Sequence, residues 1–202
     1  MLSVAMILFA FVSGSFPFSA WLGNLLLGVD VRQYGDGNPG AANVFNSGSK
    51  GVGLLALILD ISKAAAPVGI AYYNLGIRGI PMYLIAIAPI LGHVFSPFLR
   101  FHGGKAIAAS LGVWIGLTIW KASLPGVIAV LIGIALFTSP GWAVMLALGV
   151  ILIALLLWMP DLLLLLVLAG ETLILAWTHR ADLRQGLHLR PWLAKRFSRA
   201  KD

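Results

Sequence analysis

Long apolar runs alternate with short polar segments along this chain of 202 residues. A membrane-spanning helix needs about 20 consecutive apolar residues. The pattern therefore predicts an all-α, polytopic membrane protein with about seven transmembrane helices. These are expected at residues 2–28, 52–73, 80–99, 106–120, 124–138, 142–158 and 161–178. The two shortest runs are expected to be tilted or to begin at a re-entrant loop.

The first run is interrupted by the letters SGSFPF, which predict a kink in the helix. No basic residue precedes this run, and its apolar character continues past any small-residue cleavage site. We therefore expect residues 2–28 to be a retained span and not a signal peptide that is removed.

Composition supports a membrane protein. The chain is 60% hydrophobic and 10% charged, whereas a soluble domain has roughly 25% charged residues. It has no Cys, which excludes disulfides, thiolate metal sites and cysteine nucleophiles. No internal repeat or linker divides it, so residues 1–202 are expected to form a single domain.

Basic residues predict the orientation of this domain. With seven spans, eleven Lys and Arg residues lie on one side of the membrane and two, Arg78 and Lys121, lie on the other. The positive-inside rule then places the N-terminus outside and the C-terminus in the cytoplasm. The basic tail, residues 187–202, is expected to lie on anionic headgroups, with a solvated disordered tail as the alternative. Contact with anionic lipid at the cytoplasmic face accounts for the net charge of +7, so we expect no nucleic acid partner.

Three polar segments meet at the cytoplasmic side in this topology: residues 29–51, 100–106 and 177–186. In the second of them, Gly103 and Gly104 precede Lys105 at the start of a predicted helix. Free backbone amides at a helix start, together with an ammonium group, form an anion site suited to phosphate. The alternative is a tight turn followed by an interfacial lysine.

The first polar segment is unusually long for a connection between adjacent spans. Its glycines expose backbone, its asparagines can bind hydroxyl groups, and an arginine at its entrance can bind phosphate. An ordinary cytoplasmic turn is the alternative. The candidate binding residues of this segment are Arg32, Gly35, Gly37, Asn38, Gly40 and Asn43.

Polar residues within or next to the apolar runs are further candidates. Asp60 and Lys63 share a helix face and predict either a structural salt bridge or a ligand contact. Ser15 accompanies the predicted kink and could line the polar site. His93 is expected to be a supporting residue, and His179, at the start of the third polar segment, is the better candidate for a site residue. No pair of His or carboxylate residues has metal-ligand spacing such as HExxH, so we expect no obligatory metal. The serine-nucleophile motif GxSxG is also not present.

Two long motifs and a weaker third resemble those of the acyl-phosphate:glycerol-3-phosphate acyltransferases of bacterial membranes, the PlsY family. They are GSFPFSAWLG followed by GVDVRQYGDGNPGAANVFNSGSKG, then GHVFSPFLRFHGGKAIAAS, and finally THRADLRQGL. The resemblance covers nearly the full chain. It implies seven spans in the bacterial inner membrane, with the active site facing the cytoplasm.

The resemblance further implies transfer of a fatty acyl group from acyl phosphate to glycerol 3-phosphate, which gives lysophosphatidic acid without a cofactor. Acyl phosphate, glycerol 3-phosphate and membrane lipids are then the partners. Lys105, His179 and Asp36 are the expected catalytic residues, and Asp182 joins the expected phosphate-binding residues.

Four positions depart from the family pattern. Asp36 stands where the family has Ser, Asn46 where it has Arg, Ala106 where it has Gly, and Asp182 where it has Asn. The changes at Asp36 and Asn46 make the first polar segment less positive. A catalytically weak paralogue therefore remains an alternative, as does a small anion or solute transporter, because glycine-broken spans can also line a transport path.

Overall fold

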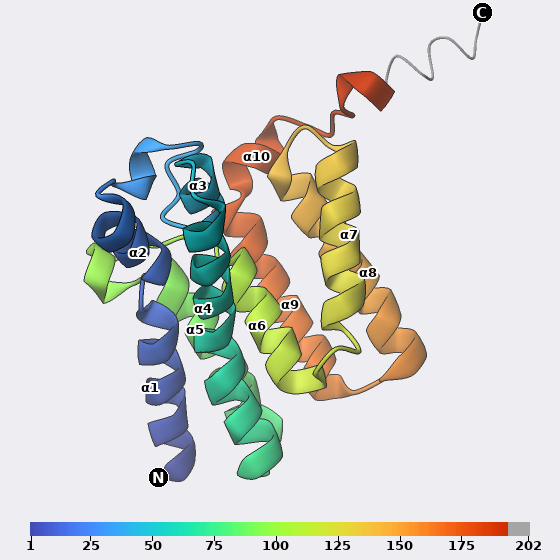
Figure 1. The fold of residues 1–202 in the computed structure, drawn as a ribbon. Helices are drawn as coiled ribbons and strands as arrows, with labels where there is room; N and C mark the ends of the chain where they lie inside the picture. Colours follow the sequence, from blue (N-terminus) through green and yellow to red (C-terminus); the bar gives the residue numbers. More distant parts are fainter. Residues whose placement is uncertain (194–202) are drawn as a thin grey trace, which may run out of the picture.

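The computed structural model describes residues 1–193 and is mainly helical (Figure 1). All seven apolar runs form helices, as predicted. The helices of the apolar runs are α1 (Leu2–Ser15), α2 (Phe18–Leu27), α4 (Lys50–Gly69) continued by the π-helix η2 (Ile70–Asn74), α5 (Gly79–Val94), α6 (Ile107–Thr118), α7 (Ser123–Leu136), α8 (Pro140–Trp158) and α9 (Leu162–Thr178). The short elements are η1 (Val31–Gln33), α3 (Ala41–Asn46), η3 (Pro97–Leu99) and α10 (Arg180–Arg184).

The first apolar run is two helices and not one. α1 ends at Ser15, Phe16 is extended with ψ 119°, and α2 begins after Pro17. Proline has no backbone N–H and disfavours a helical conformation in the residue before it. The kink expected at SGSFPF is therefore a complete break of the helix.

A buried ion pair binds the chain at this break. Lys63 Nζ lies 2.6 Å from Asp60 Oδ1 and donates to Phe16 O at 2.7 Å. Asp60 also accepts a hydrogen bond from Ser19 Oγ on α2. The pair thus satisfies a carbonyl exposed by the break and connects both halves of the first run to α4. This geometry favours the structural salt bridge over the ligand contact.

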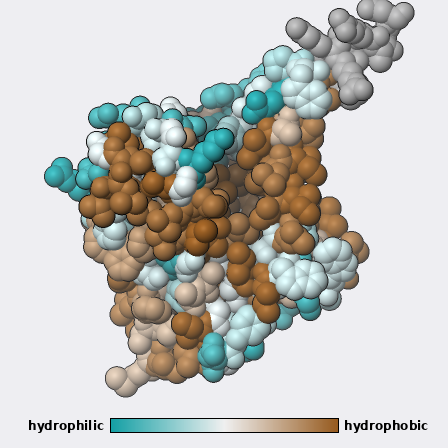
Figure 2. Space-filling view, in the orientation of Figure 1, coloured by the Kyte–Doolittle hydropathy of each residue, from teal (hydrophilic) through white to brown (hydrophobic). Residues whose placement is uncertain are grey.

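The helices pack in pairs, α1 on α5, α4 on α6 and α7 on α8, while α9 contacts both α5 and α8. Among residues 1–193, four helical stretches are long and apolar enough to cross a membrane: Leu2–Leu27, Lys50–Asn74, Gly79–Leu99 and Pro140–Trp158. α6, α7 and α9 are shorter apolar helices. Figure 2 shows hydrophobic side chains over the flanks of the bundle and hydrophilic ones gathered mainly at its upper end.

The N-terminus lies at the end of the bundle opposite to α3 and α10 (Figure 1). The three polar segments of the sequence therefore share one end, as expected. Beyond α10, residues 187–193 run beside the end of α7, where Arg190 Nε donates to Ile134 O at 2.9 Å. The remainder of the basic tail, residues 194–202, lies outside the described residues, so its predicted membrane contact stays a prediction.

Candidate active site

The three polar segments enclose a cleft of about 420 Å³ at this end of the bundle. Segment 29–51 forms one wall, the connection between α5 and α6 forms the second, and the junction of α9 with α10 forms the third. Of the predicted site residues, Arg32, Asp36, Gly37, Asn38, Gly103, Gly104 and Lys105 line this cleft. The convergence on which the sequence interpretation depended is thus present in the structure.

Lys105 is the centre of the cleft. Its Nζ atom lies 2.9 Å from Asp36 Oδ2 and 3.1 Å from Asp182 Oδ2. Burial by itself lowers the pKa of Lys105, but hydrogen bonds and charge interactions with the two carboxylates outweigh burial and raise the pKa above its usual value. Lys105 is therefore a permanent cation at neutral pH, and in this structure two carboxylates already contact it.

The backbone amides of Gly103 and Gly104 do not face a ligand, which corrects the expectation from the sequence. Gly103 N donates to Val94 O at 3.0 Å, and Gly104 N donates to His93 O at 3.1 Å. A Cβ atom on Gly103 would collide with the His93 carbonyl, and one on Gly104 with the His93 ring. The glycines are needed because this segment packs directly against the end of α5.

The start of α6 lies beside the first polar segment, and the anion site expected there stays a prediction. Lys105 N donates to Asn38 Oδ1 at 3.0 Å, which joins the first polar segment to the second. No side chain caps the first turn of α6, which begins at Ile107. Unsatisfied amides at a helix start favour anions. Ala106 adopts the left-handed conformation, with φ +66°, where the family pattern has glycine.

Asn43 organises the first polar segment and does not line the cleft. Its Nδ2 atom donates to Asn38 O at 2.9 Å and to Asp36 Oδ1 at 3.2 Å, while its Oδ1 atom accepts from Asn46 at 3.1 Å. Both hydrogens of its amide are therefore used within the segment, and the role of Asn43 in binding a polyol hydroxyl stays a prediction. Gly35 and Gly40 lie beside this network and outside the cleft lining.

Arg32 stands at the mouth of the cleft, as expected, but its charge is matched by Asp30. Arg32 Nη2 lies 2.8 Å from Asp30 Oδ2, and Arg32 Nε donates to both carboxylate oxygens. The hydrogen bonds from Arg32 lower the pKa of Asp30 below its usual value. A phosphate that binds Arg32 must therefore share it with Asp30.

Three predicted site residues lie behind the cleft wall. His179 is fully buried, its Nδ1 atom faces Leu175 O at 2.9 Å, and burial lowers its pKa. His93 is buried against Gly104. Ser15 Oγ donates to Phe11 O at 2.7 Å, within its own helix. None of the three lines the cleft.

The structure adds two polar residues that sequence reasoning missed. Arg180 lines the cleft, stacks on the Trp177 ring with its Cζ atom 4.8 Å from the ring centroid, and donates to Trp177 O at 2.8 Å. Thr178 Oγ1 donates to Lys105 O at 3.2 Å. Their position on either side of His179 in the third polar segment was the available signal.

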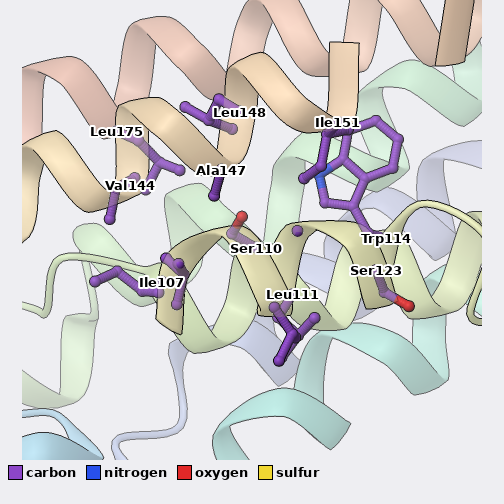
Figure 3. Close-up of a pocket in the computed structure, with 13 residues that line it drawn as sticks. Ile107, Ser110, Leu111, Trp114, Ser123, Val144, Ala147, Leu148, Ile151 and Leu175 are labelled. Atoms are coloured by element: carbon purple, nitrogen blue, oxygen red, sulfur yellow. The ribbon is translucent and has the colours of Figure 1, made fainter. Parts of the chain in front are cut away.

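An apolar pocket lies between α6, α7, α8 and α9 (Figure 3). It starts at Ile107, two residues after Lys105, and reaches Trp114 and Ile151 at its far end. Glu171 is fully buried beside it and accepts a hydrogen bond from Ser110. Sequence reasoning missed Glu171, although an acidic residue within an apolar run is itself a signal. Within residues 1–193, no group of three or more His, Asp or Glu residues could hold a metal ion.

Long apolar helices, with a charged cleft at one end of the bundle, are typical of an integral membrane protein with a polar site. The family model for glycerol-3-phosphate acyltransferase matches residues 4–188. The chain therefore belongs to the glycerol-3-phosphate acyltransferase family.

Individual relatives agree with this assignment. A glycerol-3-phosphate acyltransferase of Aromatoleum aromaticum is 39% identical over 184 residues, which are 89% of this chain and 90% of the relative. One from Anaeromyxobacter dehalogenans is 40% identical over 148 residues, 70% of this chain and 72% of the relative.

Two solved structures share the fold. The crystal structure of PlsY, an integral membrane glycerol 3-phosphate acyltransferase, in its glycerol 3-phosphate form has a TM-score of 0.83 at 27% identity and covers 98% of this chain and 100% of that one. The lysophosphatidic acid form has a TM-score of 0.82 at 26% identity and covers 92% and 91% of the two chains.

Proposed function

We propose that this protein transfers a fatty acyl group from acyl phosphate to the 1-hydroxyl of glycerol 3-phosphate and so forms lysophosphatidic acid. The observation that carries the proposal is the position of Lys105. It stands in a polar cleft that three separate segments enclose, two residues before the first lining residue of an apolar pocket, in a chain of the acyltransferase family.

The reaction suits these residues because acyl phosphate is already an activated anhydride, so no Ser or Cys nucleophile is required. The 1-hydroxyl oxygen attacks the acyl carbonyl carbon, a C–O ester bond forms, the anhydride C–O bond breaks, and inorganic phosphate leaves. The protein has to position two phosphorylated substrates and neutralise their charge. Lys105 supplies a cation at the centre of the cleft, and Arg32 and Arg180 supply cations at its edges.

The attacking hydroxyl loses a proton, which needs an acceptor within hydrogen-bond reach. Asp36 is the proposed acceptor once Lys105 has moved onto a substrate phosphate, because its side chain is about half exposed to the cleft, at 49%. Asn38 holds the backbone of Lys105, and Asp182 holds its ammonium group from the other side. Because His179 is buried behind this cleft wall, we assign it a positioning role for Thr178 and Arg180.

The acyl tail of the donor is proposed to enter the apolar pocket, which lies between α6, α7, α8 and α9. We further propose seven spans, with the N-terminus outside the cell membrane and the cleft at the cytoplasmic face, on the distribution of Lys and Arg. A cleft at one end of the bundle favours an enzyme over a transporter, whose site lies near the middle of the membrane.

The test is acyl transfer by the purified full-length protein in liposomes. With acyl phosphate and labelled glycerol 3-phosphate, the wild type is expected to form labelled lysophosphatidate, and Lys105→Met is expected to lose at least roughly a hundredfold in rate. Lys121→Met, which removes an exposed lysine between α6 and α7, is the matched control and should keep full activity. Equal rates for the two variants would refute the role of Lys105. A folded wild type that is inactive with every polyol phosphate would leave the weak paralogue as the better reading.

A further inference from the structure

The charged residues that line the cleft, taken together with their ion-pair partners, carry no net charge, although the proposed substrates are anionic. The lining residues are Arg32, Asp36, Lys105 and Arg180, and the partners outside the lining are Asp30 and Asp182. Arg32 pairs with Asp30, and Lys105 pairs with both Asp36 and Asp182. Within residues 1–193, Arg180 has no carboxylate within salt-bridge distance and contacts Trp177.

We propose that Asp36 and Asp182 compete with the substrate phosphate for Lys105 and so set the affinity of the cleft for phosphorylated substrates. This inference rests on the proposed function, and it assigns the affinity of the cleft for phosphorylated substrates to two residues of this chain. Both carboxylates stand where the family pattern has neutral side chains, Ser and Asn. Both carboxylates contact the same atom, Lys105 Nζ, from elements that are distant in sequence.

Asp36 is the stronger competitor because its own segment fixes it in place. Its Oδ1 atom accepts hydrogen bonds from the Asn43 side chain and from the Asn38 backbone amide, both at 3.2 Å. The other oxygen, Oδ2, is thereby kept pointing at Lys105 Nζ, 2.9 Å away. A phosphate oxygen bound to Lys105 would lie close to this fixed carboxylate, and two like charges at short range repel each other.

The side chain of Asp182 makes fewer hydrogen bonds than that of Asp36. Asp182 lies on α10, a helix of five residues, and its side-chain contact to Lys105 is longer, at 3.1 Å. Its backbone carbonyl accepts from Ser139 Oγ, which holds the backbone of Asp182 against the start of α8. Phosphate binding is therefore expected to displace Asp182 from Lys105, while Asp36 stays near the ligand and opposes it.

Calorimetric titration of the full-length protein in detergent with glycerol 3-phosphate, and separately with inorganic phosphate, tests this inference. Asp36→Asn keeps the shape of the side chain and is expected to bind both probes about five- to tenfold more tightly than the wild type. Asp36→Ser, the residue of the family pattern, should do the same. Asp161→Asn is the control, because it removes a carboxylate at the start of α9 and keeps a good N-cap residue.

The competition of Asp36 and Asp182 with phosphate for Lys105 is named the clamp, and the outcomes separate it from the acyltransferase proposal. Tighter binding by both Asp36 variants supports the clamp, even if no protein in the series transfers an acyl group. Unchanged or weaker binding by folded Asp36→Asn, with a wild type that is active in liposomes, would overturn the clamp alone. If Asp161→Asn bound the probes as much more tightly as Asp36→Asn does, the change in affinity would come from overall charge, and the clamp would be overturned. Failure of every protein to bind either probe would also overturn the clamp.

Discussion

Replacing Lys63 by Met should strongly destabilise the protein, because Lys63 belongs to a buried ion pair at the break between α1 and α2. The side chains of Lys63 and Asp60 are 1% and 2% exposed. Removing one partner of such a pair costs about 3–5 kcal/mol. The substitution also removes the donor to Phe16 O, and an unsatisfied buried carbonyl costs about 1–3 kcal/mol, part of which is included in the first figure. We therefore expect a loss of at least about 3 kcal/mol.

The assay is reversible unfolding in mixed detergent micelles, with Lys121→Met as an exposed control of the same chemistry. The double variant Asp60→Asn/Lys63→Met leaves no unpaired charge and should recover about 1–3 kcal/mol relative to the sum of the two single variants. Additive losses, or a Lys63→Met protein as stable as Lys121→Met, would refute the assignment of this pair to a structural role.

Three further substitutions test the connection between α5 and α6 and its neighbour α10. Gly103→Ala should cost both stability and turnover, because its Cβ atom would meet the His93 carbonyl; unchanged unfolding and activity would contradict this. Ala106→Gly should stabilise the protein by about 1 kcal/mol, because φ +66° is strained for alanine, and a lower unfolding free energy would count against it. Burial lowers the pKa of His179 in the folded state, so the unfolded chain binds more protons below about pH 6.5. The stability of the wild type relative to His179→Gln should therefore fall from pH 8 to pH 5, and thermal unfolding that shows a constant difference would exclude this.

The helices could be predicted because each apolar run has the length and composition that a membrane requires. α8 and α9 lie within two residues of their predicted bounds. The break at Phe16 and Pro17 was expected only as a kink. What closes it is a long-range contact from Lys63, and a contact between residues 47 positions apart cannot be read from the local pattern.

The candidate site was predicted in its location and only partly in its detail. The pattern GGK indicated where Lys105 lies, because a lysine after paired glycines at a helix start is a local feature. The same pattern suggested free glycine amides, whereas tertiary packing directs those amides to the carbonyls at the end of α5. The contacts of Asp36 and Asp182 with one ammonium group depend on how three segments meet, which the sequence does not specify locally.

The central claim is that Lys105 exchanges its carboxylate partners for a substrate phosphate, and a structure of this protein with bound glycerol 3-phosphate tests it most directly. We predict a phosphate oxygen within hydrogen-bond distance of Lys105 Nζ and a separation of Lys105 Nζ from Asp182 Oδ2 clearly longer than the 3.1 Å described here. A phosphate bound elsewhere, with Lys105 still held between Asp36 and Asp182, would contradict the claim.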